Sequence, residues 1–414
     1  MEKISLVAKH AQDKSETDNI FGVNSAANAK AEIVGKENIV NASIGAFLDA
    51  SGKLITLPTV EKTMYSLPFD DVANYAPIAG LPDYINAVID VTFGENKPDA
   101  FVKGIATPGG SGAIHHAIWN YTEEGDTYLT SDWFWGPYKT MAREMMRKID
   151  TFMTFDEEGK FNLQACIEKV EALAKVQKNV LLILNTPAHN PTGYSLTDDE
   201  WQALIDAFTE LCNKKENNII LFVDIAYMDF APEGSRKFFK KFSNLPANFL
   251  VLVGFSMSKG YTMYGYRTGC LLGISSDEQV ITEFYDVNQF SSRGTWSNCT
   301  RSGMRLLIDL WKNPELMAKV NAERNEYRES MEDRAHTFIN EAKEVGLKMC
   351  PYDSGFFITI PTTKAEEVGL KLREDNIFLV SLKKGLRIAI CAVPAEKIKG
   401  MATKIKKAID QIEG

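Results

Sequence analysis

The sequence contains no apolar run long enough to span a membrane, and residues 1–5 lead into a polar segment without the apolar region of a signal peptide. It has only six cysteines, without Cys-x-x-Cys spacing, and only five histidines, without the spacing of metal ligands. These shortages argue against a disulfide framework and against a structural metal site. We therefore expect free thiols in a reducing cytoplasm, with no membrane attachment and no metal. The cysteines are Cys166, Cys212, Cys270, Cys299, Cys350 and Cys391.

The sequence also lacks an excess of positive charge. Its formal net charge of −9 argues against nucleic acid or an acidic membrane surface as a main partner, although local arginines can still bind an anionic substrate. With 45% hydrophobic and 24% charged residues, the composition is that of an ordinary globular protein. A chain of 414 residues is too long for one compact core, so the sequence predicts two domains.

Short apolar runs alternate with helical patterns between about residues 103 and 275, which is typical of a parallel or mixed sheet covered by helices. Four of these runs end in polar segments. Because ligands of open α/β sheets bind beyond the carboxyl ends of the strands, we expect the four segments to converge on one pocket. They are residues 107–112 after 103–106, 185–193 after 179–184, 224–227 after 219–223, and 256–259 after 249–255.

The last of these segments, Ser256-Met-Ser-Lys259, carries the clearest chemistry, and Arg267 follows eight residues after the lysine. A lysine at the end of a buried strand can form a Schiff base with an aldehyde cofactor. Two hydroxyls and a guanidinium beside it suit a phosphate group. The motif alone also fits a solvated lysine after a strand, so its meaning depends on the other strand ends.

Together with further blocks, these segments resemble the fold-type I, pyridoxal-phosphate-dependent aminotransferases of class I and II, most closely the aspartate and aromatic (tyrosine) branch. The resemblance covers nearly the whole chain. It implies an α/β fold with a large domain around a mostly parallel seven-stranded sheet, a smaller α+β domain, pyridoxal 5′-phosphate as cofactor, and a homodimer with shared active sites. The further blocks are residues 41–47, 49–53, 57–58, 74–80, 293–298 and 385–387.

The resemblance places four residues around the cofactor ring. Lys259 would form the Schiff base and, once freed by substrate, move a proton between the substrate Cα and the cofactor. Asp224 would pair with the protonated pyridine nitrogen, which removes the cost of burying an unpaired carboxylate at a strand end. Tyr227 and Asn190 would share the phenolic oxygen of the cofactor. The alternative is that Asp224 and Tyr227 form an ordinary turn.

Six residues are expected around the cofactor phosphate. A glycine-rich turn at the start of a helix offers backbone N–H groups to an anion, although such turns also close strands for steric reasons. Serine hydroxyls and an arginine fork add donors. The resemblance implies that Tyr75 reaches the phosphate of the neighbouring subunit, so that dimerisation is part of the site. The six residues are Gly109, Gly110, Ser111, Ser256, Ser258 and Arg267.

The resemblance favours Trp135 as the ring that stacks on the cofactor, beside the substrate and Asn190. Trp133 and Tyr138 in the same aromatic cluster are alternatives for this stacking. The sequence around residues 133–138 is consistent with either a cofactor contact or an ordinary aromatic core.

Two arginines are candidates for binding the carboxylates of the substrate. Arg387, inside an apolar strand, is expected to bind the α-carboxylate, with Ile44 and Gly45 against the same substrate. A structural carboxylate near Arg387 is the alternative, because arginine is seldom fully buried unless paired. Arg293 resembles the arginine that the partner subunit supplies for the distal carboxylate of aspartate, glutamate and 2-oxoglutarate.

The sequence departs from the family after Arg293. Cys299 and Thr300 stand where the family usually has two prolines. This departure leaves open the position of Arg293, and with it whether the preferred donor is aspartate or an aromatic amino acid.

These residues predict an aminotransferase that moves an amino group between an L-amino acid, aspartate and/or aromatic, and 2-oxoglutarate by a ping-pong mechanism. One alternative is a lyase or decarboxylase of the same fold. Arg387 and Arg293 favour transamination because both half-substrates must be held alike. The other alternative is a non-catalytic ligand-binding protein on this fold, which usually loses the lysine or carries a fused DNA-binding segment.

We expect three segments along the chain: residues 1–50 packing with the small domain, a large cofactor-binding domain at 51–311, and a small domain at 312–414. Residues 197–200 predict a capping box that begins a helix. In the small domain we expect strands at 355–360, 377–380 and 386–390, and amphipathic helices at 327–345 and about 395–412.

Overall fold

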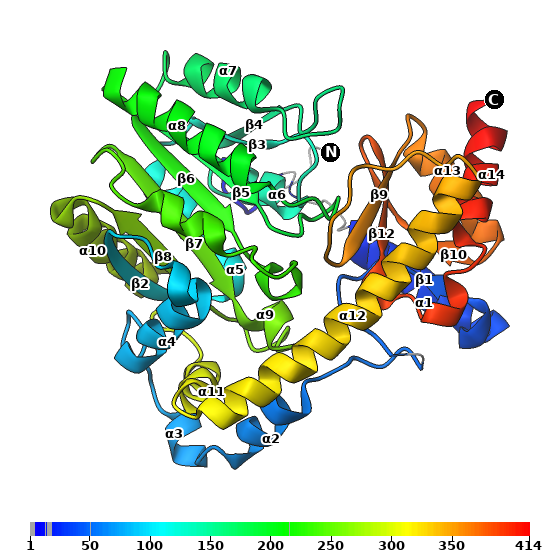
Figure 1. The fold of residues 1–414 in the computed structure, drawn as a ribbon, viewed down its shortest axis with the longest axis horizontal. Helices are drawn as coiled ribbons and strands as arrows, with labels where there is room; N and C mark the ends of the chain where they lie inside the picture. The colour runs from blue at the N-terminus through cyan, green and yellow to red at the C-terminus, as the bar shows by residue number, and fades with distance from the viewer. Residues whose placement is uncertain (1–4, 13, 15–18, 50, 215) are drawn as a thin grey trace.

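The computed structural model describes residues 5–12, 14, 19–49, 51–214 and 216–414. The largest element of this described part is a seven-stranded sheet (Figure 1). Strand β8 runs antiparallel to both of its neighbours, and the other neighbouring pairs are parallel. The predicted mostly parallel seven-stranded sheet is thereby confirmed. In spatial order the strands are β2 (Phe101–Pro108), β8 (Thr268–Ser275), β7 (Phe249–Ser256), β6 (Asn218–Asp224), β5 (Asn179–Asn185), β3 (Thr127–Ser131) and β4 (Lys148–Phe152).

Both faces of this sheet are covered by helices, which is why its central strands are apolar throughout. In β6, Ile219, Leu221 and Val223 pack into one core, and Ile220 and Phe222 pack into the other, as a period of two requires. Helices α4 (Pro82–Phe93), α7 (Leu163–Leu173), α8 (Asp198–Lys214) and α11 (Arg301–Trp311) contribute to the first core; α5 (Gly109–Tyr121), α6 (Pro137–Glu144) and α10 (Glu278–Thr295) contribute to the second.

A further core lies in the C-terminal part of the chain, on a three-stranded antiparallel sheet. Ala42 and Phe47 from the N-terminal segment belong to this core as well. This packing supports the proposed discontinuous small domain, whose boundaries at residues 50 and 311 remain a prediction. The sheet has the order β11 (Val380–Leu382), β12 (Gly385–Ala389), β9 (Phe357–Pro361), and it packs with α13 (Ala365–Glu374) and α14 (Met401–Glu413).

The long helix α12 (Pro314–Glu344) joins the two regions (Figure 1). Val320, near its start, packs in a core of the large sheet, whereas Met331, Ala335 and Phe338 pack in the C-terminal core. The predicted helix at 327–345 is therefore the second half of a longer one. The remaining elements are α1 (Asn19–Val34), α2 (Pro58–Ser66), α3 (Phe69–Ala73), α9 (Met257–Gly260), β1 (Val40–Asn41), β10 (Ile377–Phe378), η1 (Lys9–Ala11), η2 (Lys36–Asn38), η3 (Gly94–Asn96), η4 (Met228–Phe230), η5 (Lys237–Phe242), η6 (Ile390–Ala392) and η7 (Ala395–Lys397).

The predicted capping box at the start of α8 is confirmed. The backbone N–H of Thr197 donates to Glu200 Oε2 at 2.8 Å, and the backbone N–H of Glu200 donates to Thr197 Oγ1 at 3.2 Å. Two backbone N–H groups at the helix start are thus satisfied reciprocally.

Two predicted elements of the C-terminal region differ from the structure. The run 377–380 is not one strand: β10 pairs in parallel with β1, whereas β11 pairs antiparallel with β12. The last helix begins at Met401 and not near 395, because Gly400 before it takes a left-handed conformation with φ 87°. A 3₁₀ turn, η7, precedes it.

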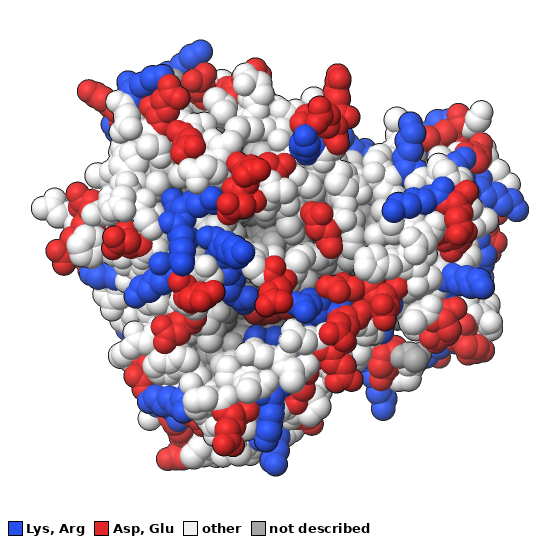
Figure 2. All heavy atoms as spheres, viewed as in Figure 1, with Lys and Arg blue, Asp and Glu red and all other residues white. Residues whose placement is uncertain are grey.

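Basic and acidic side chains are interspersed over the face of the molecule in Figure 2, and acidic side chains gather along α12. None of the described helices is long and apolar enough to cross a membrane.

Candidate active site

The four polar strand ends predicted from the sequence lie together at one edge of the large sheet. Strands β2, β5, β6 and β7 run in the same direction, so their carboxyl ends share that edge. A cavity opens there and is bordered by residues from all of these ends. It is lined by Gly110, Ser111, Ile114, Trp135, Asn185, Asn190, Asp224, Ala226, Tyr227, Ser256, Ser258, Lys259 and Arg267.

Lys259 lies on α9, a single helical turn directly after β7. Ser256 caps this turn, since its Oγ accepts a hydrogen bond from the backbone N–H of Ser258 at 3.2 Å. The lysine Nζ donates to the carbonyl oxygen of Gly45 at 3.2 Å and lies 4.5 Å from the centre of the Tyr264 ring. Burial lowers the pKa of Lys259 to about 8, helped by the nearby positive charges of Arg267 and Arg387. An amine with this pKa is partly neutral near pH 8 and able to act as a nucleophile or base.

Asp224 is the last residue of β6 and is only 6% exposed. Its Oδ2 accepts a hydrogen bond from the Tyr138 hydroxyl at 2.8 Å, and its Oδ1 accepts one from the backbone N–H of Ala226 at 3.1 Å. Burial raises the pKa of Asp224, and these two bonds oppose that rise. A carboxylate has about four lone-pair positions, so Asp224 can still accept a hydrogen bond from a cation in the cavity.

The side-chain amide of Asn190 forms hydrogen bonds with both Tyr227 and Arg387. Its Nδ2 donates to the Tyr227 hydroxyl at 3.4 Å, and its Oδ1 accepts from Arg387 Nη1 at 3.3 Å. Arg387 Nη2 also donates to the carbonyl oxygen of Ser43 at 2.7 Å. The side chains of Asn190, Tyr227 and Arg387 are all buried, and burial raises the pKa of Tyr227. Arg387 thus donates to an amide oxygen and to a backbone carbonyl oxygen, and its planar guanidinium has the geometry that matches a carboxylate.

The other end of the cavity forms a cradle for an anion. Gly109 begins α5 with φ 70°, and a Cβ built there would lie 2.9 Å from Arg267 Nη2, so the guanidinium can approach the helix start only because this residue is glycine. Arg267 Nη2 also lies 3.5 Å from Ser111 Oγ. A helix N-terminus with an adjacent arginine and serine hydroxyls suits a phosphate.

Trp135 lines this cavity, whereas Trp133 and Tyr138 do not. Trp133 lies under Lys384, with Nζ 5.2 Å from its ring centre, and Tyr138 packs edge-on against Trp135 at 5.6 Å. The placement therefore favours Trp135 among the three aromatic candidates for stacking.

A second cavity of about 340 Å³ adjoins the first and shares Trp135 and Asn190 with it. Arg387 lines it together with mostly apolar and hydroxyl side chains, so it offers a place for a substrate side chain next to a carboxylate-binding group. Its lining is Asn19, Ile20, Phe134, Trp135, Gly136, Pro137, Thr140, Asn190, Pro191, Val380, Ser381, Leu382 and Arg387.

Five predicted site residues do not line either cavity of their own chain: Ile44, Gly45, Tyr75, Gly109 and Arg293. Tyr75 is 83% exposed, and Arg293 is exposed at the end of α10, where its Nη1 donates to Ser297 Oγ at 2.5 Å. Ile44 is half-buried beside Ser43 and Gly45, and the carbonyl oxygen of Gly45 accepts the hydrogen bond from Lys259 Nζ.

The segment after Arg293, which lacks the two prolines, packs against α5 and β2. The Trp296 ring stacks on His116 of α5 with 4.3 Å between centroids, and Cys299 Sγ lies 3.3 Å from the carbonyl oxygen of Ala106. Both contacts tie the Arg293 segment to the strand and helix that form the anion cradle.

Comparison with known proteins decides the family. The sequence pattern of the family "Aminotransferase class I and II" matches residues 37–405. The chain belongs to this family. Aminotransferases of class I and II use pyridoxal 5′-phosphate, and the buried lysine, the buried carboxylate and the anion cradle described above fit that cofactor.

Individual relatives agree with this assignment. The aminotransferase superposes on a crystal structure of an aminotransferase from Anaerococcus prevotii with a TM-score of 0.96 and 40% identity, covering 98% of this chain and 100% of that one. It is 23% identical over 412 residues to the cytoplasmic aspartate aminotransferase of Gallus gallus, covering 92% and 93% of the two chains. An aromatic-amino-acid aminotransferase from Burkholderia pseudomallei, covalently bound to pyridoxal phosphate, shares the fold with a TM-score of 0.79 at 22% identity, covering 98% and 100%.

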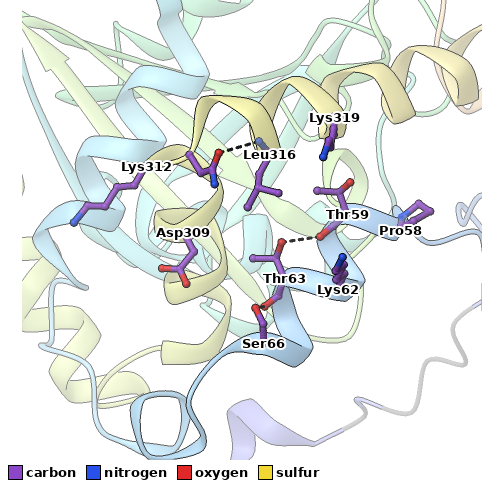
Figure 3. A pocket seen from close by; sticks show the side chains of 10 residues that line it. Pro58, Thr59, Lys62, Thr63, Ser66, Asp309, Lys312, Leu316 and Lys319 are labelled. Atoms are coloured by element: carbon purple, nitrogen blue, oxygen red, sulfur yellow. Dashed lines mark hydrogen bonds between the residues drawn. The ribbon is translucent and has the colours of Figure 1, made fainter.

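A separate hollow of the aminotransferase, between α2 and the start of α12, lacks comparable chemistry (Figure 3). Lys62, Lys312 and Lys319 border it, but Lys312 pairs with Asp83. The Thr63 hydroxyl donates to its own helix, to the carbonyl oxygen of Thr59 at 2.8 Å. In the described part of the chain, no group of three or more His, Cys, Asp or Glu side chains is placed to hold a metal ion.

Two residues of the aminotransferase site were missed from the sequence. Asn185 ends β5, donates to the Asp224 carbonyl oxygen at 2.9 Å, and accepts from the Asn190 backbone N–H at 2.6 Å. Its position at the end of a buried strand, like that of Asp224, was the available signal. The sequence marks Tyr138 only as an alternative stacking ring, because its hydrogen bond to Asp224 joins residues 86 positions apart.

Proposed function

We propose that the aminotransferase moves an amino group between an L-amino acid, aspartate and/or aromatic, and 2-oxoglutarate by a ping-pong mechanism. The observation that carries this proposal is the row formed by Lys259, Tyr227, Asn190 and Arg387, with the second cavity beside Arg387. An α-carboxylate bound by Arg387 would place the adjacent Cα toward the lysine. The cavity then receives the substrate side chain.

When bound, pyridoxal phosphate supplies an electron sink that lets a proton leave the substrate Cα. Lys259, whose pKa of about 8 allows a neutral amine, would take and return that proton. Asp224 would hold the ring nitrogen protonated, and Tyr227 with Asn190 would hold the phenolic oxygen. The Gly110–Ser111 turn, Ser256, Ser258 and Arg267 would anchor the phosphate and fix the ring against Trp135.

A second carboxylate on the substrate requires a second cation beside the substrate side chain. Arg387 is the sole arginine or lysine among the described residues that line the second cavity. We therefore assign Arg293 of a partner subunit to the distal carboxylate, and Tyr75 of that subunit to the phosphate. The exposure of both side chains on their own chain supports a homodimer with shared sites.

Mixing two variants that are each impaired in dicarboxylate turnover tests the shared site. An Arg293→Ala chain and a Lys259→Ala chain, dissociated and reassociated together, are expected to regain dicarboxylate turnover, since one site of each mixed dimer then has both intact residues. Each variant mixed with itself serves as control. The assignment would be contradicted if the wild-type enzyme sedimented as a monomer and was fully active. It would also be contradicted if the mixture was no more active than the two variants measured separately.

Specificity gives a second test. Arg293→Ala should cost about 2–5 kcal/mol in transition-state binding of glutamate, whose distal charge would lose its partner, and far less for phenylalanine. The kcat/KM ratio of glutamate over phenylalanine should therefore fall steeply. Equal losses on both substrates would mean that Arg293 is structural.

A panel of aspartate, glutamate, tyrosine, phenylalanine and alanine, each with 2-oxoglutarate as acceptor, tests the proposed substrates directly. Transfer from aspartate or an aromatic donor is expected. Pyruvate or ammonia released without an acceptor would indicate the lyase or decarboxylase alternative instead. We also propose a cytoplasmic location, supported by the Gallus gallus relative that carries this term in its name.

A further inference from the structure

Tyr138 makes a contact that no proposed step yet uses. It lies in the first turns of α6, is fully buried, and its hydroxyl donates to Asp224 Oδ2 at 2.8 Å. It does not line the cavity, whereas Asp224 does. The tyrosine therefore reaches the carboxylate from the protein side and leaves the cavity side of Asp224 accessible to a ligand.

Several contacts hold Tyr138 in this position. Its carbonyl oxygen accepts a hydrogen bond from the Tyr128 hydroxyl at 2.5 Å, and its ring packs edge-on against Trp135 at 5.6 Å and parallel to Phe134 at 6.5 Å. A ring fixed on several sides keeps its hydroxyl aimed at one acceptor. The same residue thus supports both the carboxylate and the ring proposed to contact the cofactor.

Only a few titratable side chains lie around the Tyr138–Asp224 pair in the described part of the chain. Lys259 faces Asp224, and Tyr128, Tyr227 and Asp224 face Tyr138. Burial and the carboxylate raise the pKa of Tyr138 well above its usual value, so the phenol stays protonated and can only donate to the ionised acid. Burial of Asp224 favours the neutral acid, and a fixed donor favours the carboxylate.

We infer that Tyr138 is a positioning residue that keeps Asp224 ionised and oriented toward the cofactor nitrogen, and so sets how strongly that nitrogen stays protonated. The inference rests on the proposed pairing of Asp224 with the nitrogen. Without the hydroxyl, the carboxyl becomes more basic, and the proton shared with the ring moves toward the acid. A less protonated ring withdraws fewer electrons, which weakens the sink and makes the lysine-bound nitrogen more basic.

Tyr138→Phe removes only the hydroxyl. The pH midpoint of the absorbance of the lysine-bound cofactor is expected to rise by ~0.5–1 unit, and kcat to fall about tenfold, with KM little changed. Tyr194→Phe is the matched control, because Tyr194 is also buried and donates to a carboxylate, Glu200 Oε1 at 2.6 Å, outside the cavity. It should leave the midpoint in place. An unshifted midpoint in Tyr138→Phe would overturn the inference.

A double variant separates this inference from the role of Asp224. If Tyr138 acts through the carboxylate, adding Tyr138→Phe to Asp224→Asn should change neither midpoint nor kcat by more than about twofold. If Asp224→Asn alone has no effect, the pairing of Asp224 with the cofactor fails. If Asp224→Asn is slow but Tyr138→Phe matches wild type, only the inference on Tyr138 fails.

A fluorinated side chain should shift the pH midpoint in the opposite direction. It also provides a test if Tyr138→Phe does not fold. 3-Fluorotyrosine at position 138 keeps the shape and is a stronger donor, so the midpoint should move to lower pH. A shift to higher pH, or none, would contradict the inference.

Discussion

Lys259→Ala is expected to reduce amino transfer by more than about 10⁴-fold, because the variant loses both the covalent attachment and the base that moves the proton. The protein should remain folded, since the Lys259 amine donates a single hydrogen bond within the described part of the chain, to the Gly45 carbonyl oxygen. Cofactor should still bind through the anion cradle, Asp224 and Tyr227. The absorbance of lysine-bound cofactor should be absent, which a spectrum of the reconstituted variant measures.

Lys319→Ala is a suitable control for this experiment, because Lys319 is exposed and lies at the separate hollow of Figure 3. It should match wild type in spectrum and rate. A Lys259→Ala protein that retained the absorbance of lysine-bound cofactor would move the covalent attachment to another residue.

Asp224→Asn is expected to slow turnover at least about 100-fold, or ~2.8 kcal/mol in the barrier, while most cofactor affinity remains. A neutral amide fills the same space but cannot stabilise a protonated ring nitrogen. The measurement is the single-turnover rate of the reconstituted variant with a saturating amino donor.

The control for Asp224→Asn is Asp150→Asn, a change of the same kind in β4 outside the cavity. Asp150 is only half-buried, and its partner is Lys169. Since an ion pair of this exposure contributes little, the control should keep its rate and stability. If Asp224→Asn also stayed within about tenfold of wild type, or ~1.4 kcal/mol, the electron-sink role would be wrong.

The sequence was most informative where strands end. Where a buried strand ends, the sequence changes from apolar to polar residues, so the end can be located from the sequence. Neighbouring parallel strands then bring such ends to the same edge of the sheet. For this reason Asp224, Asn190 and Lys259 could be placed in one cavity from sequence alone. The capping box at Thr197 was equally local, since both of its partners lie within one helical turn.

Contacts between segments that are distant along the chain could not be predicted from the sequence. The bond from Tyr138 to Asp224 depends on how α6 packs on the sheet, which no local pattern encodes. The run 377–380 looked like one strand because its apolar residues are continuous, but β1 from the N-terminal segment takes its first half. Arg293 and Tyr75 are exposed and do not line the cavities of their own chain, so one chain cannot test their roles.

The most direct test of the account is borohydride reduction of the wild-type holoenzyme followed by peptide mass mapping. The lysine-bound cofactor should be trapped on Lys259 in the resting enzyme. After the best amino donor of the panel is added without an acceptor, the label on Lys259 should disappear and one equivalent of keto acid should be released per site. A label on another lysine, or a label on Lys259 that persists after the donor, would contradict the account.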